Sequence, residues 1–261
     1  TTVVGNTTKQ TYAKYPVSGL IYEKNNFKTV EQTQAMLTAM KELSIENVAL
    51  PIFLGVQEEG GKASVIASKT PIDVDNIDNM SEIGATGDNT KAYEAGQTIG
   101  KYLNELGFNM DFAPVADLAN VEGSIMKKRA YGADAATVSP FVTSMMMGLQ
   151  EQGITACLKH FPGIGSTTAD THEGLVSIER TAEEMRAEEL KVFQTGIDAG
   201  AQMIMVGHAD VEALSGDKTP ASMSQVIVTD ILRNELGFQG VIITDAMNLS
   251  AISEYYSAEQ A

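Results

Sequence analysis

The chain has 261 residues, of which 43% are hydrophobic, so it can bury a large core, and this length suits one α/β barrel or two smaller domains. Its net charge of −16 would be repelled by a nucleic-acid backbone, which argues against nucleic-acid binding. A single cysteine, Cys157, excludes an internal disulfide framework, and no apolar run reaches the roughly 18 residues that predict a membrane span.

Short apolar runs alternate with longer segments of helical periodicity along the whole chain. The runs predict six strands, in chain order at 17–22, 50–56, 110–115, 155–159, 203–207 and 241–244. The segments between them predict helices near 29–43, 89–106, 136–152, 181–199 and 224–236. This alternation is typical of parallel strands joined by right-handed crossovers. Because no Pro/Gly/Ser-rich linker divides the chain, we expect a single domain over residues 1–261.

Local signals mark several helix ends. Thr181 begins the capping-box pattern Thr-Ala-Glu-Glu, which predicts the start of a helix. Gly153, Gly200 and Gly237 follow predicted helix ends, where a left-handed backbone favours glycine. Cys157 lies inside a predicted buried strand, so we interpret it as a small core residue.

Polar side chains follow the carboxyl ends of nearly all predicted strands. A (β/α)8 barrel builds its active site from these ends, whereas an open nucleotide-binding sheet carries a glycine-rich phosphate loop that this sequence lacks. We therefore predict an α/β fold of the (β/α)8 TIM-barrel type. The polar residues at successive strand ends are Gln57, Glu58, Glu59, Asp117, Lys159, His160, His208 and Asp245.

Two of the three histidines lie in one segment, from Lys159 to His172, with the sequence KHFPGIGSTTADTH. Imidazole titrates near neutral pH and therefore suits proton transfer, so their placement at a strand end and in a Gly-rich loop favours a functional site. The alternative is that each histidine is an ordinary polar residue at the end of an element.

This segment resembles the K-H-F-P-G-x-G-x-T-x-x-D-[ST]-H block of glycoside hydrolase family 3, in its β-N-acetylhexosaminidase (NagZ-like) branch. Residues 59–61 are similar to an E-G-G motif of that branch, and residues 106–117 and 241–247 resemble its fourth strand and its nucleophile strand. The resemblance covers nearly the whole chain. It implies a retaining exo-β-N-acetylglucosaminidase that needs no metal or organic cofactor and acts on amino-sugar oligosaccharides or cell-wall fragments.

Retaining hydrolysis needs a carboxylate nucleophile and a proton donor for the leaving oxygen. The resemblance implies that Asp245 is the nucleophile and that His172, held by Asp170, is the acid and base. From the residues alone, Asp170 could instead form an Asx turn, and Asp245 could cap a helix.

The resemblance also implies a set of substrate-binding residues, in which we expect Asp117 to brace Arg129 or Lys159. Three alternatives remain open: Arg129 in a solvated basic loop, His208 as a structural histidine, and Glu58 and Glu59 as solvated loop charges. The implied substrate-binding residues are Lys159, His160, Arg129, Asp117, His208 and Gln57.

Three positions depart from the family pattern. Gln57 replaces an aspartate, Val65 an arginine, and Ile164 a second histidine. The nucleophile and the histidine–aspartate pair are intact, so the chemistry is retained while the sugar subsite is altered. The resemblance also places a first strand before Thr1 and a last one after Ala261, so we expect an incomplete barrel in this chain.

The sequence is also compatible with other functions. The same barrel could act as a phosphorylase, as another β-glycosidase or as a non-catalytic sugar-binding protein. A metal-dependent amidohydrolase is a more distant alternative, because its H-x-H motif is not visible in the sequence. The sequence leaves the oligomeric state open, and also the compartment, which could be the bacterial cytoplasm or the cell exterior.

Overall fold

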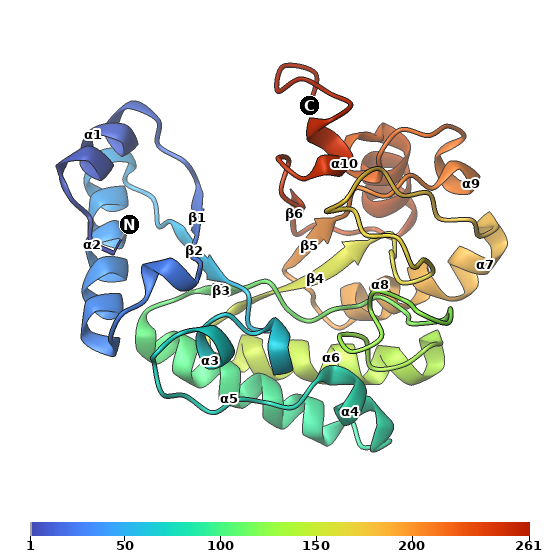
Figure 1. Cartoon of the computed structure of the whole chain (residues 1–261), viewed down its shortest axis with the longest axis horizontal. Helices are drawn as coiled ribbons and strands as arrows, with labels where there is room; N and C mark the ends of the chain where they lie inside the picture. The colour runs from blue at the N-terminus through green and yellow to red at the C-terminus, as the bar shows by residue number, and fades with distance from the viewer. Residues whose placement is uncertain (1) are drawn as a thin grey trace.

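The computed structural model describes residues 2–261, and six strands in it form one parallel sheet. The strands pair in chain order, and Figure 1 shows them along a curved path like half a barrel, with α5 and α6 beneath. The strands are β1 (Gly19–Ile21), β2 (Phe53–Val56), β3 (Met110–Asp111), β4 (Thr155–Phe161), β5 (Met203–Val206) and β6 (Val241–Thr244).

All six predicted strands are present. The third is the most shortened, to Met110–Asp111, because Pro114 has no N–H to donate to a sheet. Beyond it, pairing continues through single contacts, as where Phe112 N donates to Val56 O at 3.0 Å. The fourth strand instead runs on to Phe161 and carries Lys159 and His160 within it.

The helices follow the predicted order, with one correction. The segment predicted as one helix over 181–199 forms two, α7 and α8, because Glu188 between them adopts a non-helical backbone (φ −119°, ψ −82°). The helices on the predicted segments are α2 (Val30–Val48), α5 (Thr90–Leu106), α6 (Ala135–Glu151), α7 (Ala182–Ala187), α8 (Glu189–Asp198) and the π-helix η4 (Val226–Glu235). The shorter elements are α1 (Asn6–Lys14), α3 (Ile66–Lys69), α4 (Met80–Ala85), α9 (Glu212–Ser215), α10 (Ser250–Ser253) and the 3-10 turns η1 (Lys24–Asn26), η2 (Gly61–Ala63) and η3 (Ala221–Met223).

The predicted helix ends are confirmed. Thr181 Oγ1 accepts the N–H of Glu184 at 3.2 Å, and the Glu184 carboxylate accepts the N–H of Thr181 at 2.9 Å. Gly153, Gly200 and Gly237 have φ values of 76°, 91° and 70°, in the left-handed region that glycine adopts without strain.

The two faces of the sheet bury different sets of side chains, as the alternation along a strand requires. One face packs into the main core with the helices, and Leu54, Val56, Leu158, Ile204 and Val206 belong to it. The other face carries a smaller cluster of Met110, Phe112, Cys157, Met203 and Met205. Cys157 is fully buried, which confirms its interpretation as a core residue.

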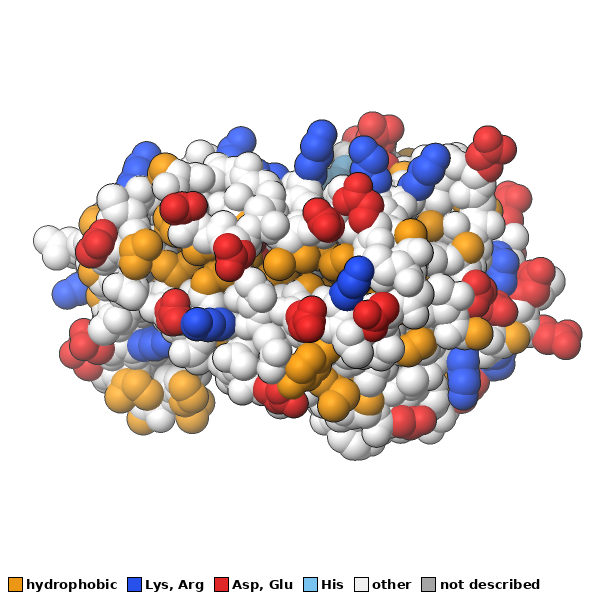
Figure 2. Space-filling model, turned by 90° about the horizontal axis from the view of Figure 1, so that it is seen from below, with side chains coloured by type: hydrophobic (Ala, Val, Ile, Leu, Met, Phe, Trp, Pro, Cys, Tyr) orange, Lys and Arg blue, Asp and Glu red, His pale blue; other side chains and the backbone are white. Residues whose placement is uncertain are grey.

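Helices α5 and α6 pack closely because glycines remove side chains at their contact. A Cβ on Gly96 would lie 2.3 Å from Met145 O, and one on Gly148 would lie 2.3 Å from Tyr93 O. Figure 2 views the molecule from the side of α4 and α5, where acidic and basic side chains are mixed with scattered hydrophobic ones. Within residues 2–261, the structure contains no helix that is both long and apolar enough to cross a membrane.

Candidate active site

A buried ionic cluster lies at the carboxyl ends of β2 and β4. Glu59 follows β2, and its carboxylate accepts hydrogen bonds from Nε and Nη2 of Arg129 at 2.7 and 2.6 Å. The Nζ atom of Lys159, on β4, lies 2.5 Å from the same carboxylate. Burial alone would raise the pKa of Glu59, but the charges of Lys159 and Arg129 outweigh it and lower that pKa to about 2. Glu59 is therefore ionised at neutral pH and fixes both cations.

The alternative that Glu58 and Glu59 are solvated loop charges is wrong, because their exposed fractions are 0% and 1%. Glu58 accepts the backbone N–H groups of Ile66 and Ala67, and Tyr102 donates its hydroxyl to Glu58 at 2.7 Å. These donors compensate for the loss of water around the carboxylate, although burial still raises the pKa of Glu58. Arg129 is likewise not in a solvated basic loop, because the buried carboxylate of Glu59 binds Nε and Nη2 of its guanidinium.

Asp117 binds His160 and not Arg129 or Lys159, which corrects our expectation. Its Oδ2 atom lies 2.7 Å from Nδ1 of His160, and its Oδ1 atom accepts the N–H of Ile164 at 2.7 Å. The expectation was wrong because the fold brings Glu59 next to Arg129 and Lys159, and Glu59 forms the ion pairs with both. Asp117 instead fixes the ring of His160 and the turn that follows β4.

Asp245 directly follows β6 and is half-buried. Its N–H donates to Val206 O at 2.8 Å, and its Oδ1 atom accepts the N–H of Ala246 at 2.7 Å. Burial would raise the pKa of this carboxyl, but His160, the Ala246 N–H and Lys159 together lower it. Asp245 is thus an ionised carboxylate at a strand end.

His208 follows β5 and is fully buried. Its Nε2 atom lies 3.0 Å from Ala246 O and its Nδ1 atom 2.8 Å from the Ser222 hydroxyl. Burial lowers the pKa of His208, which favours a neutral ring that donates from Nε2 and accepts at Nδ1. These contacts hold the backbone next to Asp245, and a direct contact of His208 with substrate stays a prediction.

Asp170 and His172 lie on the loop 166–180, which connects β4 to α7 and which we call the dyad loop. Nδ1 of His172 lies 2.7 Å from Oδ1 of Asp170, and the side chains are 65% and 43% exposed. Burial would raise the pKa of Asp170, but the backbone N–H and ring of His172 lower it. Because the carboxylate occupies Nδ1, the Nε2 atom is the ring nitrogen available to exchange a proton with a substrate.

The residues that depart from the family pattern lie beside these groups. Gln57 follows β2, where its side-chain Nε2 atom donates to Ala63 O at 3.3 Å and its backbone carbonyl accepts the N–H of Val65 at 2.9 Å. Ile164 is buried, with 3% of its surface exposed, and forms part of the main core. The substrate-binding roles assigned to Gln57, Lys159, His160, Arg129 and Asp117 stay predictions.

Sequence reasoning missed Glu189, a buried acid at the start of α8. Its Oε1 atom accepts hydrogen bonds from Ser166 Oγ at 2.7 Å and Asn120 Nδ2 at 3.0 Å. The sequence contains one signal: Glu189 is four residues from both Met185 and Phe193, so it lies on the apolar face of its segment.

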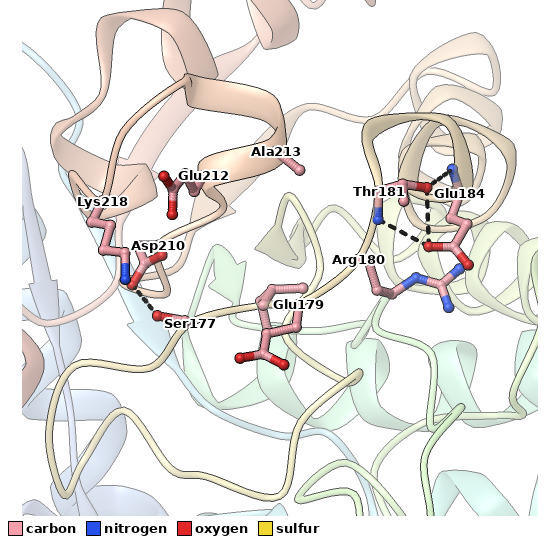
Figure 3. A pocket seen from close by; sticks show the side chains of 10 residues that line it. Ser177, Glu179, Arg180, Thr181, Glu184, Asp210, Glu212, Ala213 and Lys218 are labelled. Carbon is pink, nitrogen blue, oxygen red and sulfur yellow. Dashed lines mark hydrogen bonds between the residues drawn. The ribbon is translucent and has the colours of Figure 1, made fainter.

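Two pockets border these groups. One is lined by Glu59, Lys62, Lys128 and Arg129 and adjoins the ionic cluster. The other, of about 440 Å³, lies at the exit of the dyad loop. Figure 3 shows Arg180, Thr181 and Glu184 on one side of it and Asp210, Glu212 and Lys218 on the other, where Ser177 donates to Asp210 at 2.6 Å. Among residues 2–261, no group of three or more His, Cys, Asp and Glu side chains is placed to hold a metal ion.

Comparison with known proteins places this arrangement among sugar hydrolases. The model of the glycosyl hydrolase family 3 N terminal domain matches residues 3–261. Beta-hexosaminidase A of Pseudoalteromonas piscicida is 31% identical to this chain over 266 residues, which cover 95% of the chain and 44% of that protein.

Solved structures of the family have the same fold. A glycoside hydrolase family 3 beta-N-acetylglucosaminidase from Paenibacillus sp. str. FPU-7 superposes with a TM-score of 0.92 and 31% identity, over 98% of this chain and 48% of that one. Native NagZ from Neisseria gonorrhoeae superposes with a TM-score of 0.85 and 25% identity, over 95% of this chain and 72% of that one. The chain thus spans less than half the length of the Pseudoalteromonas and Paenibacillus proteins.

Proposed function

Since this chain belongs to glycoside hydrolase family 3, we propose that it carries the catalytic groups of a retaining exo-β-N-acetylglucosaminidase. The observation that carries this proposal is the pair of opposed chemical roles of Asp245, which follows β6, and His172, on the dyad loop. Asp245 is an ionised carboxylate, whereas His172 has one nitrogen bound to Asp170 and the other available for a proton. Retaining hydrolysis requires a nucleophile and an acid of these two kinds.

The reaction takes two steps. In the first, a carboxylate oxygen of Asp245 attacks the anomeric carbon, the bond to the leaving oxygen breaks, and Nε2 of His172 gives its proton to that oxygen. In the second, water attacks the anomeric carbon, gives a proton to Nε2 and releases the Asp245 carboxylate. Asp170 stabilises the ring in both protonation states, as a carboxylate does in a Ser-His-Asp triad.

The sugar is bound by the buried polar groups around this centre. We assign Lys159 and Arg129 to sugar hydroxyls, because Glu59 fixes both cations at the strand ends. His160, Asp117, His208 and Gln57 complete the proposed binding set. The names of the relatives support β-linked N-acetylglucosamine as the substrate. We propose that this sugar is supplied by amino-sugar oligosaccharides or cell-wall fragments.

Mass spectrometry after exposure to a slow fluorinated β-N-acetylglucosaminide tests the proposal. We expect a sugar adduct on the peptide that contains Asp245, and no adduct in an Asp245→Asn variant of the same stability. An adduct on another residue would overturn the assignment of the nucleophile. Turnover of the parent sugar without any adduct would overturn the covalent mechanism, and a folded protein without turnover would overturn the activity.

We also propose that residues 1–261 act as one domain and that its six strands belong to a (β/α)8 barrel that two further parallel strands close. The exposed side chains on the two edge strands support this, since Ile21 on β1 is 65% exposed and Val241 on β6 is 40% exposed. Hydrogen exchange in the protein as it occurs naturally tests it. Slow exchange at Gly19–Ile21 and Val241–Thr244 is expected, and rapid exchange there would contradict it.

A further inference from the structure

Glu189 is a buried acid where the amphipathic pattern calls for an apolar side chain. Its carboxylate is 1% exposed, and it shares the face of α8 that packs toward β4. Burying a carboxylate costs free energy unless hydrogen bonds and opposite charge replace the lost water. The partners of Glu189 therefore indicate what the carboxylate does.

Those partners lie at both ends of the dyad loop. Ser166, at its start, donates to Oε1 of Glu189 at 2.7 Å, and Arg180, at its end, places Nε 3.1 Å from the same oxygen. Asn120, in the segment after β3, donates to this oxygen at 3.0 Å. One oxygen atom thus joins the two ends of the segment that carries Asp170 and His172. Fixing both ends of a flexible loop limits where its middle can reach.

The turn after His160 is also shaped around this side chain. Gly163 lies so close to Glu189 that an added Cβ would be 2.7 Å from Cγ and 2.9 Å from Cβ of the glutamate. The N–H of Gly163 donates to His160 O at 2.8 Å, so Glu189 packs beneath the turn that links His160 to the dyad loop.

A simpler explanation is that Glu189 stabilises the N-terminus of α8, where negative charge is favourable. That role would require no contact with the loop. The side chain of the neighbouring Glu188 accepts the N–H of Ala135, at the start of α6, at 2.7 Å, and this hydrogen bond does not involve the dyad loop. Glu188 therefore provides a matched control with the same charge, next to Glu189 in sequence.

The contact also has unused hydrogen-bonding capacity. Oε2 of Glu189, Nε of Arg180 and Oδ1 of Asn120 are buried and form no hydrogen bond among the described residues. The contact of Glu189 with Arg180 is therefore an ion pair at 3.1 Å and not a well-aligned hydrogen bond. Figure 3 shows Arg180 beside the pocket at the exit of the loop.

We propose that Glu189 is a positioning residue, whose carboxylate ties Ser166 to Arg180 and so sets where His172 points. This inference rests on the proposed function, because His172 must deliver its proton to the leaving oxygen. A positioning role can be distinguished from a merely structural one, because a misplaced acid slows most strongly those reactions whose leaving group needs protonation.

The test compares two β-N-acetylglucosaminides in the protein as it occurs naturally. A dinitrophenyl leaving group departs without protonation, whereas a sugar leaving group needs it. In Glu189→Gln we expect kcat/KM to fall about 10-fold to 100-fold for the sugar leaving group, because a misplaced general acid loses part of its full effect. For the dinitrophenyl leaving group we expect kcat/KM to fall less than about 3-fold. Azide, which attacks without a general base, should restore kcat on the dinitrophenyl substrate.

Two further variants serve as controls for Glu189→Gln. Glu188→Gln should leave the ratio of the two kcat/KM values unchanged. Ser166→Ala, which removes the hydrogen bond from Ser166 to Glu189, should shift this ratio in the same direction as Glu189→Gln but by less. Equal losses on both substrates without azide rescue, or no loss in Glu189→Gln, would overturn the inference. Inactivity of the unsubstituted protein on both substrates would instead overturn the proposed function.

Discussion

Asp170 binds His172 twice, since its Oδ1 atom accepts the backbone N–H at 2.9 Å and lies 2.7 Å from Nδ1 of the ring. The first contact is the Asx turn that the sequence left open, and the second orients the imidazole. The two interpretations of Asp170 are thus compatible, because one carboxylate oxygen forms both contacts. Aspartate suits this position because its short side chain can accept the backbone N–H of the residue two positions further along the chain.

Azide should distinguish the roles of Asp245 and His172 by the stereochemistry of the product. With a dinitrophenyl β-N-acetylglucosaminide, Asp245→Ala should form the α-azide, because azide attacks from the side that the carboxylate vacates. His172→Ala should form the β-azide, because azide attacks the glycosyl-enzyme that Asp245 still makes. Product analysis by NMR measures both, and the same anomer from both variants would contradict the assignment.

Stability should depend on pH through Glu59. Its folded pKa of about 2 lies below the ordinary value of 4.5, so its contribution is present above pH 4.5 and is lost as the pH falls toward 2. This contribution is on the order of 3 kcal/mol, from about 1.4 kcal/mol for each unit of pKa. Denaturant unfolding at pH 5 and pH 2 should show this loss in the unsubstituted chain.

Two variants separate this effect from general acid denaturation. Glu59→Gln should lower the unfolding free energy at pH 5, because Lys159 loses its buried partner, and should weaken the pH dependence. Glu46→Gln, at an exposed position on α2, should change neither. An unchanged pH dependence in Glu59→Gln would show that the cluster does not contribute as described.

The contact of α5 with α6 should not tolerate a methyl group at Gly148. Because an added Cβ would lie 2.3 Å from Tyr93 O and 2.8 Å from Gln97 N, both backbone atoms, Gly148→Ala should destabilise the fold by about 1–3 kcal/mol. Denaturant midpoints measure this. Gly5→Ala, where nothing lies within 4 Å of the added carbon, is the control, and equal midpoints for the two variants would contradict the prediction.

Much of the fold follows from short-range patterns. The strands predicted at 155–159 and 203–207 form at 155–161 and 203–206, and the capping box forms at Thr181. These features were predictable because each depends on residues a few positions apart. The contact of Asp170 with His172 is of the same kind. The break at Glu188 was not predictable in this way, because the periodicity of residues 181–199 continues through it.

The sequence by itself determined the order of elements, the residues at the strand ends and the local pair Asp170–His172. The tertiary structure alone decided that Glu59 binds Arg129 and Lys159, that Asp117 binds His160, and that Glu189 joins Ser166 to Arg180. The physical reason is that a buried charge pairs with whichever opposite charge the folded chain brings nearest. That choice depends on the meeting of distant segments, which periodicity and spacing do not encode.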